Sequence, residues 1–119
     1  MDDDLAAWGK VVILETTGRD SGRPRRAALG FVVEPSGSLL VAANGPETHW
    51  ALNLFAHPGC VVEREGVGTP HVAEPLEDSA RQSAVTALIL KYGTPAERLG
   101  WGPAFRLVPA DSSVRGEGS

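Results

Sequence analysis

Short apolar runs separated by glycine and proline make up most of the hydrophobic pattern of the chain. Runs of this kind, rich in β-branched residues and bounded by turn residues, predict β-strands. The first run, residues 11–17, is apolar at every position from Val11 to Leu14, which predicts a strand in the interior of a sheet. Five more runs predict strands at residues 27–34, 39–43, 61–65, 69–73 and 105–108. The pattern therefore predicts a mainly β protein with six strands.

Residues 35–38 join the second and third of these strands. Pro35 and Gly37 supply the fixed and the positive φ angles of a tight turn, so the flanking strands are predicted to form an antiparallel hairpin.

Two segments carry apolar residues at helical spacing instead. The first follows Pro46 and ends before Pro58. The second starts at Asp78, a favourable N-cap, and ends at Gly93, which can adopt the left-handed conformation of a C-terminal cap. We therefore expect two helices between the strands.

Composition and charge restrict the class of protein. A length of 119 residues, with 42% hydrophobic and 22% charged residues, is typical of one globular domain. We expect a single domain over residues 1–109 and a disordered tail over residues 110–119, where only Val114 could be buried. No run approaches the roughly 20 apolar residues of a membrane span, and a net charge of -4 gives no overall attraction for nucleic acid. The acidic residues 2–4 and the single cysteine favour a cytoplasmic location.

Four arginines lie within residues 19–26 of this otherwise acidic chain. Glycines and Ser21 in the same segment allow a turn whose backbone amides face an anion, and guanidinium groups suit two-point contacts with phosphate or carboxylate. This predicts a phosphate-binding turn, with a solvated basic hairpin as the alternative. Asn44 and Gly45, just before the first predicted helix, offer either a second anion site or a simple turn.

Other chemical groups give weaker indications. The three histidines lack the spacing of a zinc site, and Cys60 has no cysteine partner, so we predict no metal. Cys60 beside two valines is typical of a small buried hydrophobe, and His57 lies near a helix C-terminus, where a positive imidazole is favourable. Trp50 and Trp101 can either pack in the core or stack on a planar ligand.

Residues 14–25, LETTGRDSGRPR, closely resemble the opening motif of the deazaflavin-dependent nitroreductase family. Residues 40–45, the Trp-x-x-Asn-Leu segment within residues 49–58, and residues 106–109 extend the resemblance. It implies a six-stranded split β-barrel of the FMN-binding and pyridoxamine-phosphate-oxidase-like kind. Members of the family bind coenzyme F420, an 8-hydroxy-5-deazaflavin with a phosphate-bearing, polyglutamylated tail, and deliver hydride to nitro groups or activated alkenes.

The resemblance also implies roles for individual residues. Those expected to hold the phosphate and acidic tail are Arg19, Ser21, Gly22 and Arg25. Those expected to lie along or near the deazaflavin ring are Ala42, Ala43, Asn44, His49 and Trp50. We expect the substrate to stack between Trp50 and the segment around Trp101, with Tyr92 or water as the proton donor.

We therefore predict a coenzyme F420-dependent oxidoreductase that reduces a small conjugated or nitro-bearing molecule. Related split barrels pair through sheet surfaces, so the resemblance also allows a homodimer. One alternative is a relative that has lost the coenzyme and uses the barrel pocket for another ligand or a non-redox reaction. It is supported by Asp20 at a usually basic position and by a short loop over residues 44–50. A second alternative, without a specific motif, is a split barrel that binds FMN or pyridoxal phosphate.

Overall fold

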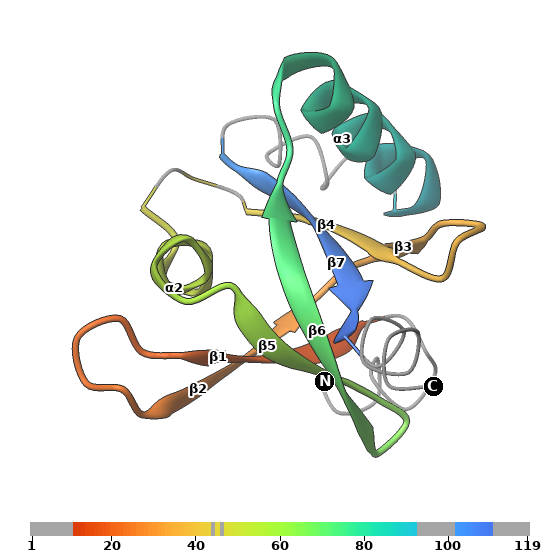
Figure 1. The fold of residues 1–119 in the computed structure, drawn as a ribbon. Helices are drawn as coiled ribbons and strands as arrows, with labels where there is room; N and C mark the ends of the chain where they lie inside the picture. Colours follow the sequence, from red (N-terminus) through yellow and green to blue (C-terminus); the bar gives the residue numbers. More distant parts are fainter. Residues whose placement is uncertain (1–10, 44, 46, 93–101, 111–119) are drawn as a thin grey trace.

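A computed structural model gives the structure of residues 11–43, 45, 47–92 and 102–110. One curled sheet of seven strands runs through it, and every neighbouring pair of strands is antiparallel (Figure 1). The order across the sheet is β2-β1-β5-β6-β7-β4-β3. The strands are β1 (Val12–Thr17), β2 (Pro24–Leu29), β3 (Val32–Val33), β4 (Leu39–Ala42), β5 (Gly59–Arg64), β6 (Val67–Pro75) and β7 (Ala104–Pro109).

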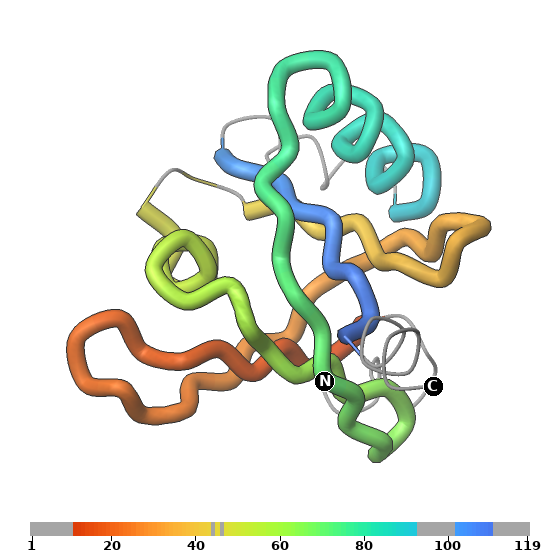
Figure 2. Tube along the Cα trace, viewed as in Figure 1, coloured from red at the N-terminus to blue at the C-terminus, as the bar shows by residue number. Residues whose placement is uncertain are grey.

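The two helices lie on different parts of this sheet. Helix α2 (His49–Ala56) follows β4 and lies beside β1, whereas α3 (Asp78–Tyr92) follows β6 and covers β4 (Figure 2). Neither of these helices is long and apolar enough to cross a membrane. The predicted cap Gly93 and residues 111–119 of the predicted tail lie outside the described residues.

Strand β4 separates two hydrophobic clusters. All four of its residues are buried, because alternate side chains of a strand point to opposite faces and both faces here are covered. Leu39 and Val41 join the main core, while Leu40 and Ala42 pack with Leu88 and other residues of α3. The sheet is therefore covered on both sides at β4.

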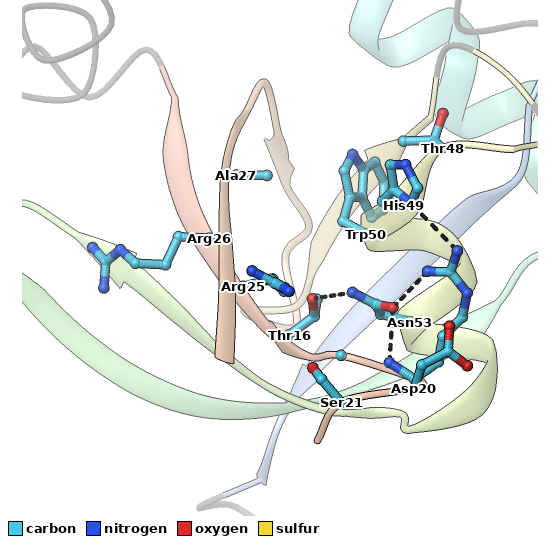
Figure 3. A pocket seen from close by; sticks show the side chains of 12 residues that line it. Thr16, Asp20, Ser21, Arg25, Arg26, Ala27, Thr48, His49, Trp50 and Asn53 are labelled. Carbon is cyan, nitrogen blue, oxygen red and sulfur yellow. Dashed lines mark hydrogen bonds between the residues drawn. The ribbon is translucent and has the colours of Figure 1, made fainter. Parts of the chain in front are cut away.

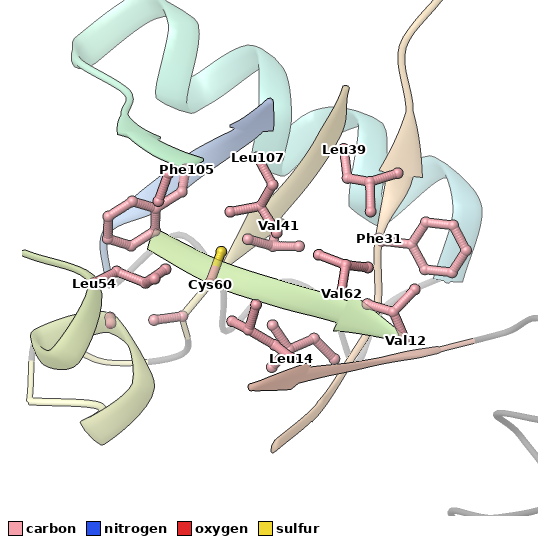
Figure 4. Close-up of a cluster of buried hydrophobic side chains, with 14 residues drawn as sticks. Val12, Leu14, Phe31, Leu39, Val41, Leu54, Cys60, Val62, Phe105 and Leu107 are labelled. Atoms are coloured by element: carbon pink, nitrogen blue, oxygen red, sulfur yellow. The ribbon is translucent and has the colours of Figure 1, made fainter. Parts of the chain in front are cut away.

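The main core lies inside the curl of the sheet, where side chains from most of the strands meet (Figure 4). Val12, Leu14 and Thr16 of β1 are buried, and the residues between them are partly exposed. Phe105 of β7 is fully buried, and its ring lies 5.1 Å from that of Phe55 on α2. This contact helps to hold α2 over one end of the core.

The predicted strand 27–34 is two strands in the structure. Its first part belongs to β2, which pairs with β1, and its second part is β3, which pairs with β4 at the other end of the sheet order. The break falls at Gly30 and Phe31, where a Cβ atom on Gly30 would lie 3.1 Å from the ring of Tyr92. Because β2 and β3 are consecutive in sequence, this short link joins the two edges of the sheet.

The other predicted elements agree closely with the structure. The hairpin over residues 35–38 is confirmed, with the N–H of Glu34 donating to the carbonyl of Ser38 at 2.8 Å and Gly37 at φ +96°. The first helix starts at His49, three residues after Pro46, and His57 caps its C-terminus by donating its N–H to the carbonyl of Asn53.

Candidate functional site

A pocket of about 660 Å³ opens between the β1–β2 turn and helix α2 (Figure 3). This volume lies in the range of small-molecule and cofactor sites. The lining residues come from β1, the turn, β2 and the start of α2, and they are Thr16, Gly18, Arg19, Asp20, Ser21, Arg25, Arg26, Ala27, Thr48, His49, Trp50 and Asn53.

Local hydrogen bonds build the turn. Gly18 receives the N–H of Gly22 at its carbonyl, and its own N–H donates to the carbonyl of Arg23 at 2.8 Å. A side chain at Gly18 would place its Cβ atom 2.7 Å from the Ser21 Oγ atom and 3.1 Å from the Arg23 carbonyl oxygen, so Ser21 would have to move. Gly22 has φ +72°, and Ser21 Oγ accepts the N–H of Arg23 at 3.1 Å. Ser21 and Gly22 therefore shape the turn that carries the arginines.

Asn53 connects α2 to both β1 and the turn. Its Oδ1 atom accepts the backbone N–H of Arg19 at 3.1 Å and the Arg19 Nη1 group at 2.9 Å. Its Nδ2 group donates to Thr16 Oγ1 at 3.1 Å, and both Asn53 and Thr16 are only 2% exposed. One buried amide thus fixes the position of Arg19 on the pocket wall.

The same guanidinium also contacts His49, one helical turn before Asn53. The Arg19 Nη2 group donates to His49 Nδ1 at 3.3 Å. The two side-chain partners of Arg19 are therefore an amide oxygen and an imidazole nitrogen, and within the described residues no carboxylate forms an ion pair with it.

Arg25 and Arg26 differ in their surroundings. Arg25 lines the pocket and has no hydrogen bond or ion pair in the part of the chain that the structure describes. Arg26 pairs with Glu63 at 2.5 Å and with Glu15 at 3.5 Å, and the hydrogen bond and charge of Glu63 raise the pKa of Arg26. Among the described residues that line the pocket, Asp20 is the single carboxylate. The pocket therefore has two uncompensated cations, Arg19 and Arg25, against one anion.

Trp50 supplies an apolar wall. It is half-buried, lines the pocket and also packs against the main core, with its ring 5.9 Å from that of Phe105. The two alternatives for Trp50, core packing and ligand contact, are thus both compatible with its place in the fold.

The pocket brings together five of the residues that the sequence singled out, namely Arg19, Ser21, Arg25, His49 and Trp50. Gly22 lies in the turn, outside the pocket lining, and Ala42 and Ala43 are buried in the two hydrophobic clusters. Asn44 and Trp101 lie outside the described residues.

Tyr92, expected as a proton donor, lies away from the pocket. Its hydroxyl accepts the N–H of Phe31 at 3.0 Å and is 3.2 Å from the Phe31 carbonyl, to which it can donate. Lys91 donates to the same carbonyl at 2.6 Å. The structure therefore gives Tyr92 a part in fixing α3 to the β2–β3 link, and its role as proton donor stays a prediction.

Asn53 belongs to the Trp-x-x-Asn-Leu motif, and the sequence predicts no role for it. The available signal was a polar side chain on the buried face of a short apolar helix, between buried Ala51 and Leu54. A buried amide needs hydrogen-bond partners, so that position alone indicates a link to another element.

The pocket suits an anionic cofactor with a planar ring. Uncompensated guanidinium groups suit phosphate and carboxylate groups, and an indole suits a ring face. Cys60 plays no part in it, since the thiol is buried in the main core and its burial raises its pKa to about 11. Over residues 11–43, 45, 47–92 and 102–110, no group of three or more His, Cys, Asp or Glu residues is arranged to hold a metal ion.

Comparison with known proteins adds an independent line of evidence. A family model described as F420H(2)-dependent quinone reductase matches residues 5–98. A solved structure described as the F420-H2 dependent reductase FDR-A is similar to this chain, with 26% identity, a TM-score of 0.68 and coverage of 82% of this chain and 93% of that chain. No curated protein matches the chain.

Two further solved structures extend the similarity of fold. One, described as a domain-swapped dimer, has 23% identity, a TM-score of 0.66 and coverage of 88% of this chain and 92% of its own. A putative pyridoxamine 5'-phosphate oxidase from Listeria innocua has 14% identity, a TM-score of 0.64 and coverage of 92% of this chain and 93% of its own. The predicted split β-barrel is confirmed, with seven strands in place of six.

Proposed function

Because the chain belongs to the F420H(2)-dependent quinone reductase family and is thus an F420-dependent oxidoreductase, we propose that it reduces a small conjugated molecule, a quinone first of all. Nitro-bearing molecules form a second substrate class within the same proposal. The observation that carries it is the pocket, in which Arg19 and Arg25 keep their positive charges beside the apolar wall of Trp50.

The residues of the pocket divide into an anion-binding part and a ring-binding part. Arg25 is free to contact a phosphate or carboxylate of the coenzyme tail, and Arg19 adds a charge that Asn53 holds in place. Trp50 offers a flat surface for a ring and excludes water from it. His49 lies beside Trp50 at the start of α2, next to this ring-binding part.

When bound, reduced coenzyme F420 supplies the hydride, while the protein binds, orients and shields the reacting molecules. Arg25 and the β1–β2 turn hold the acidic end of the coenzyme. Trp50 then determines which face of a planar molecule stays accessible. These tasks require no covalent bond to the protein.

We expect Arg25→Ala to weaken coenzyme F420 binding roughly tenfold to a hundredfold, because a charge-assisted contact worth about 1.5 to 3 kcal/mol is lost. Isothermal titration calorimetry with the purified protein measures this change. Arg23→Ala is the matched control: it removes the same charge from an exposed residue of the same turn that does not line the pocket. Equal effects of the two substitutions, or an unchanged affinity of Arg25→Ala, would contradict the assignment.

A homodimer is part of the proposal, and its support is that one similar solved structure is described as a domain-swapped dimer. Light scattering after size-exclusion chromatography gives the mass of the protein in solution. A monomer at all concentrations would contradict the proposed homodimer. A cytoplasmic location stays a prediction from the sequence.

A further inference from the structure

The contact between Arg19 and His49 determines which nitrogen of the imidazole carries the proton. A guanidinium can only donate hydrogen bonds, so His49 Nδ1, 3.3 Å from Arg19 Nη2, must accept. In the neutral ring the proton then lies on Nε2. A proton on Nδ1 would break this hydrogen bond, so the contact favours the ring whose Nδ1 carries no proton.

The position of Arg19 is itself fixed. Asn53 accepts from both the backbone and the side chain of Arg19, and Thr16 holds the amide of Asn53. His49 and Asn53 are four residues apart on α2, so Arg19 spans neighbouring side chains on one helix face. The imidazole is therefore oriented by a chain of hydrogen bonds that begins at a buried threonine.

This arrangement leaves one polar atom of His49 for a ligand. His49 lines the pocket, is exposed, and its Nε2 atom has no partner in the described part of the chain. Its neighbour Trp50 forms the apolar wall. A planar molecule against Trp50 would thus have the Nε2–H donor of His49 near its edge.

We propose that His49 donates a hydrogen bond from Nε2 to the carbonyl oxygen of the substrate, with Arg19 and Asn53 as positioning residues. The inference rests on the proposed function and narrows its substrate class to conjugated molecules with an acceptor oxygen. As hydride adds to a conjugated carbonyl, negative charge grows on that oxygen, and a fixed N–H donor stabilises it.

His49 gives this hydrogen bond without giving up its proton. Loss of the Nε2 proton from a neutral ring would leave an imidazolate, which is much more basic than the reduced oxygen of a quinone. The proton that completes the reduction therefore comes from water, and the balance is one hydride and one proton added to each substrate molecule.

The tautomer can be measured on the protein without coenzyme. Long-range proton–nitrogen NMR spectra of ¹⁵N-labelled protein distinguish the Nε2–H ring, the Nδ1–H ring and the imidazolium, and the His49→Gln variant identifies the His49 signals. We expect the Nε2–H pattern at neutral pH, and Arg19→Met should convert it to a mixture. A native Nδ1–H ring or an imidazolium would overturn the inference.

Kinetics with 1,4-naphthoquinone as the probe test the role itself. We expect His49→Phe to lower kcat/KM about tenfold to a hundredfold, and His49→Gln, which keeps a donor, to restore much of it. The affinity for coenzyme F420 should stay within about twofold. His57→Phe is the control, because His57 is exposed at the opposite, C-terminal end of the same helix and does not line the pocket.

The outcomes separate the two proposals. If the native protein neither binds coenzyme F420 nor reduces the quinone, the proposed function fails, and this inference fails with it. If native turnover is normal and His49→Phe matches His57→Phe, only the inference is overturned. A loss of coenzyme affinity in His49→Phe that accounts for the whole loss of rate would overturn it too, since His49 would then serve the coenzyme.

Discussion

At the scale of single residues, Asp20 is the one pocket residue whose charge opposes the proposed ligand. At about 6 Å from a bound phosphate and an effective dielectric constant of roughly 20 to 80, its repulsion is about 0.7 to 3 kcal/mol. Asp20→Asn should therefore tighten coenzyme F420 binding roughly threefold to a hundredfold, and the gain should shrink as salt screens the charges.

Calorimetry at low and high salt measures this gain. Glu65→Gln is the comparison, since it neutralises an exposed carboxylate outside this pocket. If Asp20→Asn left the affinity unchanged at low salt, the anionic end of the coenzyme would have to lie elsewhere.

Cys60 gives the fold a pH dependence of known sign. Burial raises the pKa of its thiol from 9.0 to about 11, so above about pH 9 the unfolded chain loses a proton that the folded chain keeps. The free energy of unfolding should fall by up to about 1.4 kcal/mol per pH unit between roughly pH 9 and 11, and this contribution is constant below that window.

Urea denaturation at about pH 8 and about pH 10 measures the slope. Cys60→Ala should show a shallower decline, because other groups titrate alike in both proteins. Parallel curves for the two proteins would mean that the thiol titrates in the same way folded and unfolded.

At the scale of elements, Tyr92 joins α3 to the link between β2 and β3. Tyr92→Phe should lower the free energy of unfolding by about 1 to 3 kcal/mol, because the N–H of buried Phe31 loses this acceptor. Coenzyme affinity and turnover should stay unchanged, since Tyr92 does not line the pocket. Denaturation and steady-state assays together measure both.

Leu90→Ala is the matched control on the same helix, because Leu90 is 82% exposed. Full stability of Tyr92→Phe together with a large loss of turnover would restore the catalytic role that the sequence suggested for this tyrosine.

The same region shows where sequence reasoning succeeds and where it stops. Local signals predicted β1 and the hairpin at Gly37, since a continuous apolar run and turn chemistry are properties of neighbouring residues. The break at Gly30 was missed because residues 27–34 form one continuous apolar run. The break depends on Tyr92, which is 61 residues from Phe31 in the sequence.

The candidate site follows the same division. The basic turn around Arg25 could be predicted from the sequence because its residues are consecutive. The family motifs predicted coenzyme F420 as the cofactor, which the family model confirms. The sequence could not predict that Asn53 contacts Thr16 and Arg19, because these contacts exist only once α2 lies against β1. The contact of Tyr92 with Phe31 has the same cause, since it forms only through tertiary packing.

At the scale of the whole molecule, the proposed function has an acidic protein with a net charge of -4 bind an acidic coenzyme through a local excess of positive charge. Arg26 does not add to that excess, because Glu63 and Glu15 neutralise it on the sheet surface. Arg19 and Arg25 act over short range at normal ionic strength, where charges about 10 Å apart are largely screened. Binding should therefore depend on these two side chains far more than on the overall charge.

The place of β7 has a consequence for synthesis. It lies between β6 and β4, yet it is the last of the described strands to leave the ribosome. Until Ala104–Pro109 has emerged, β4 and β6 each have one edge without a partner strand. All four residues of β4 are buried in the folded protein. Translation that stops before Ala104 would thus give a fragment with two unpaired strand edges, which chaperones and proteases recognise.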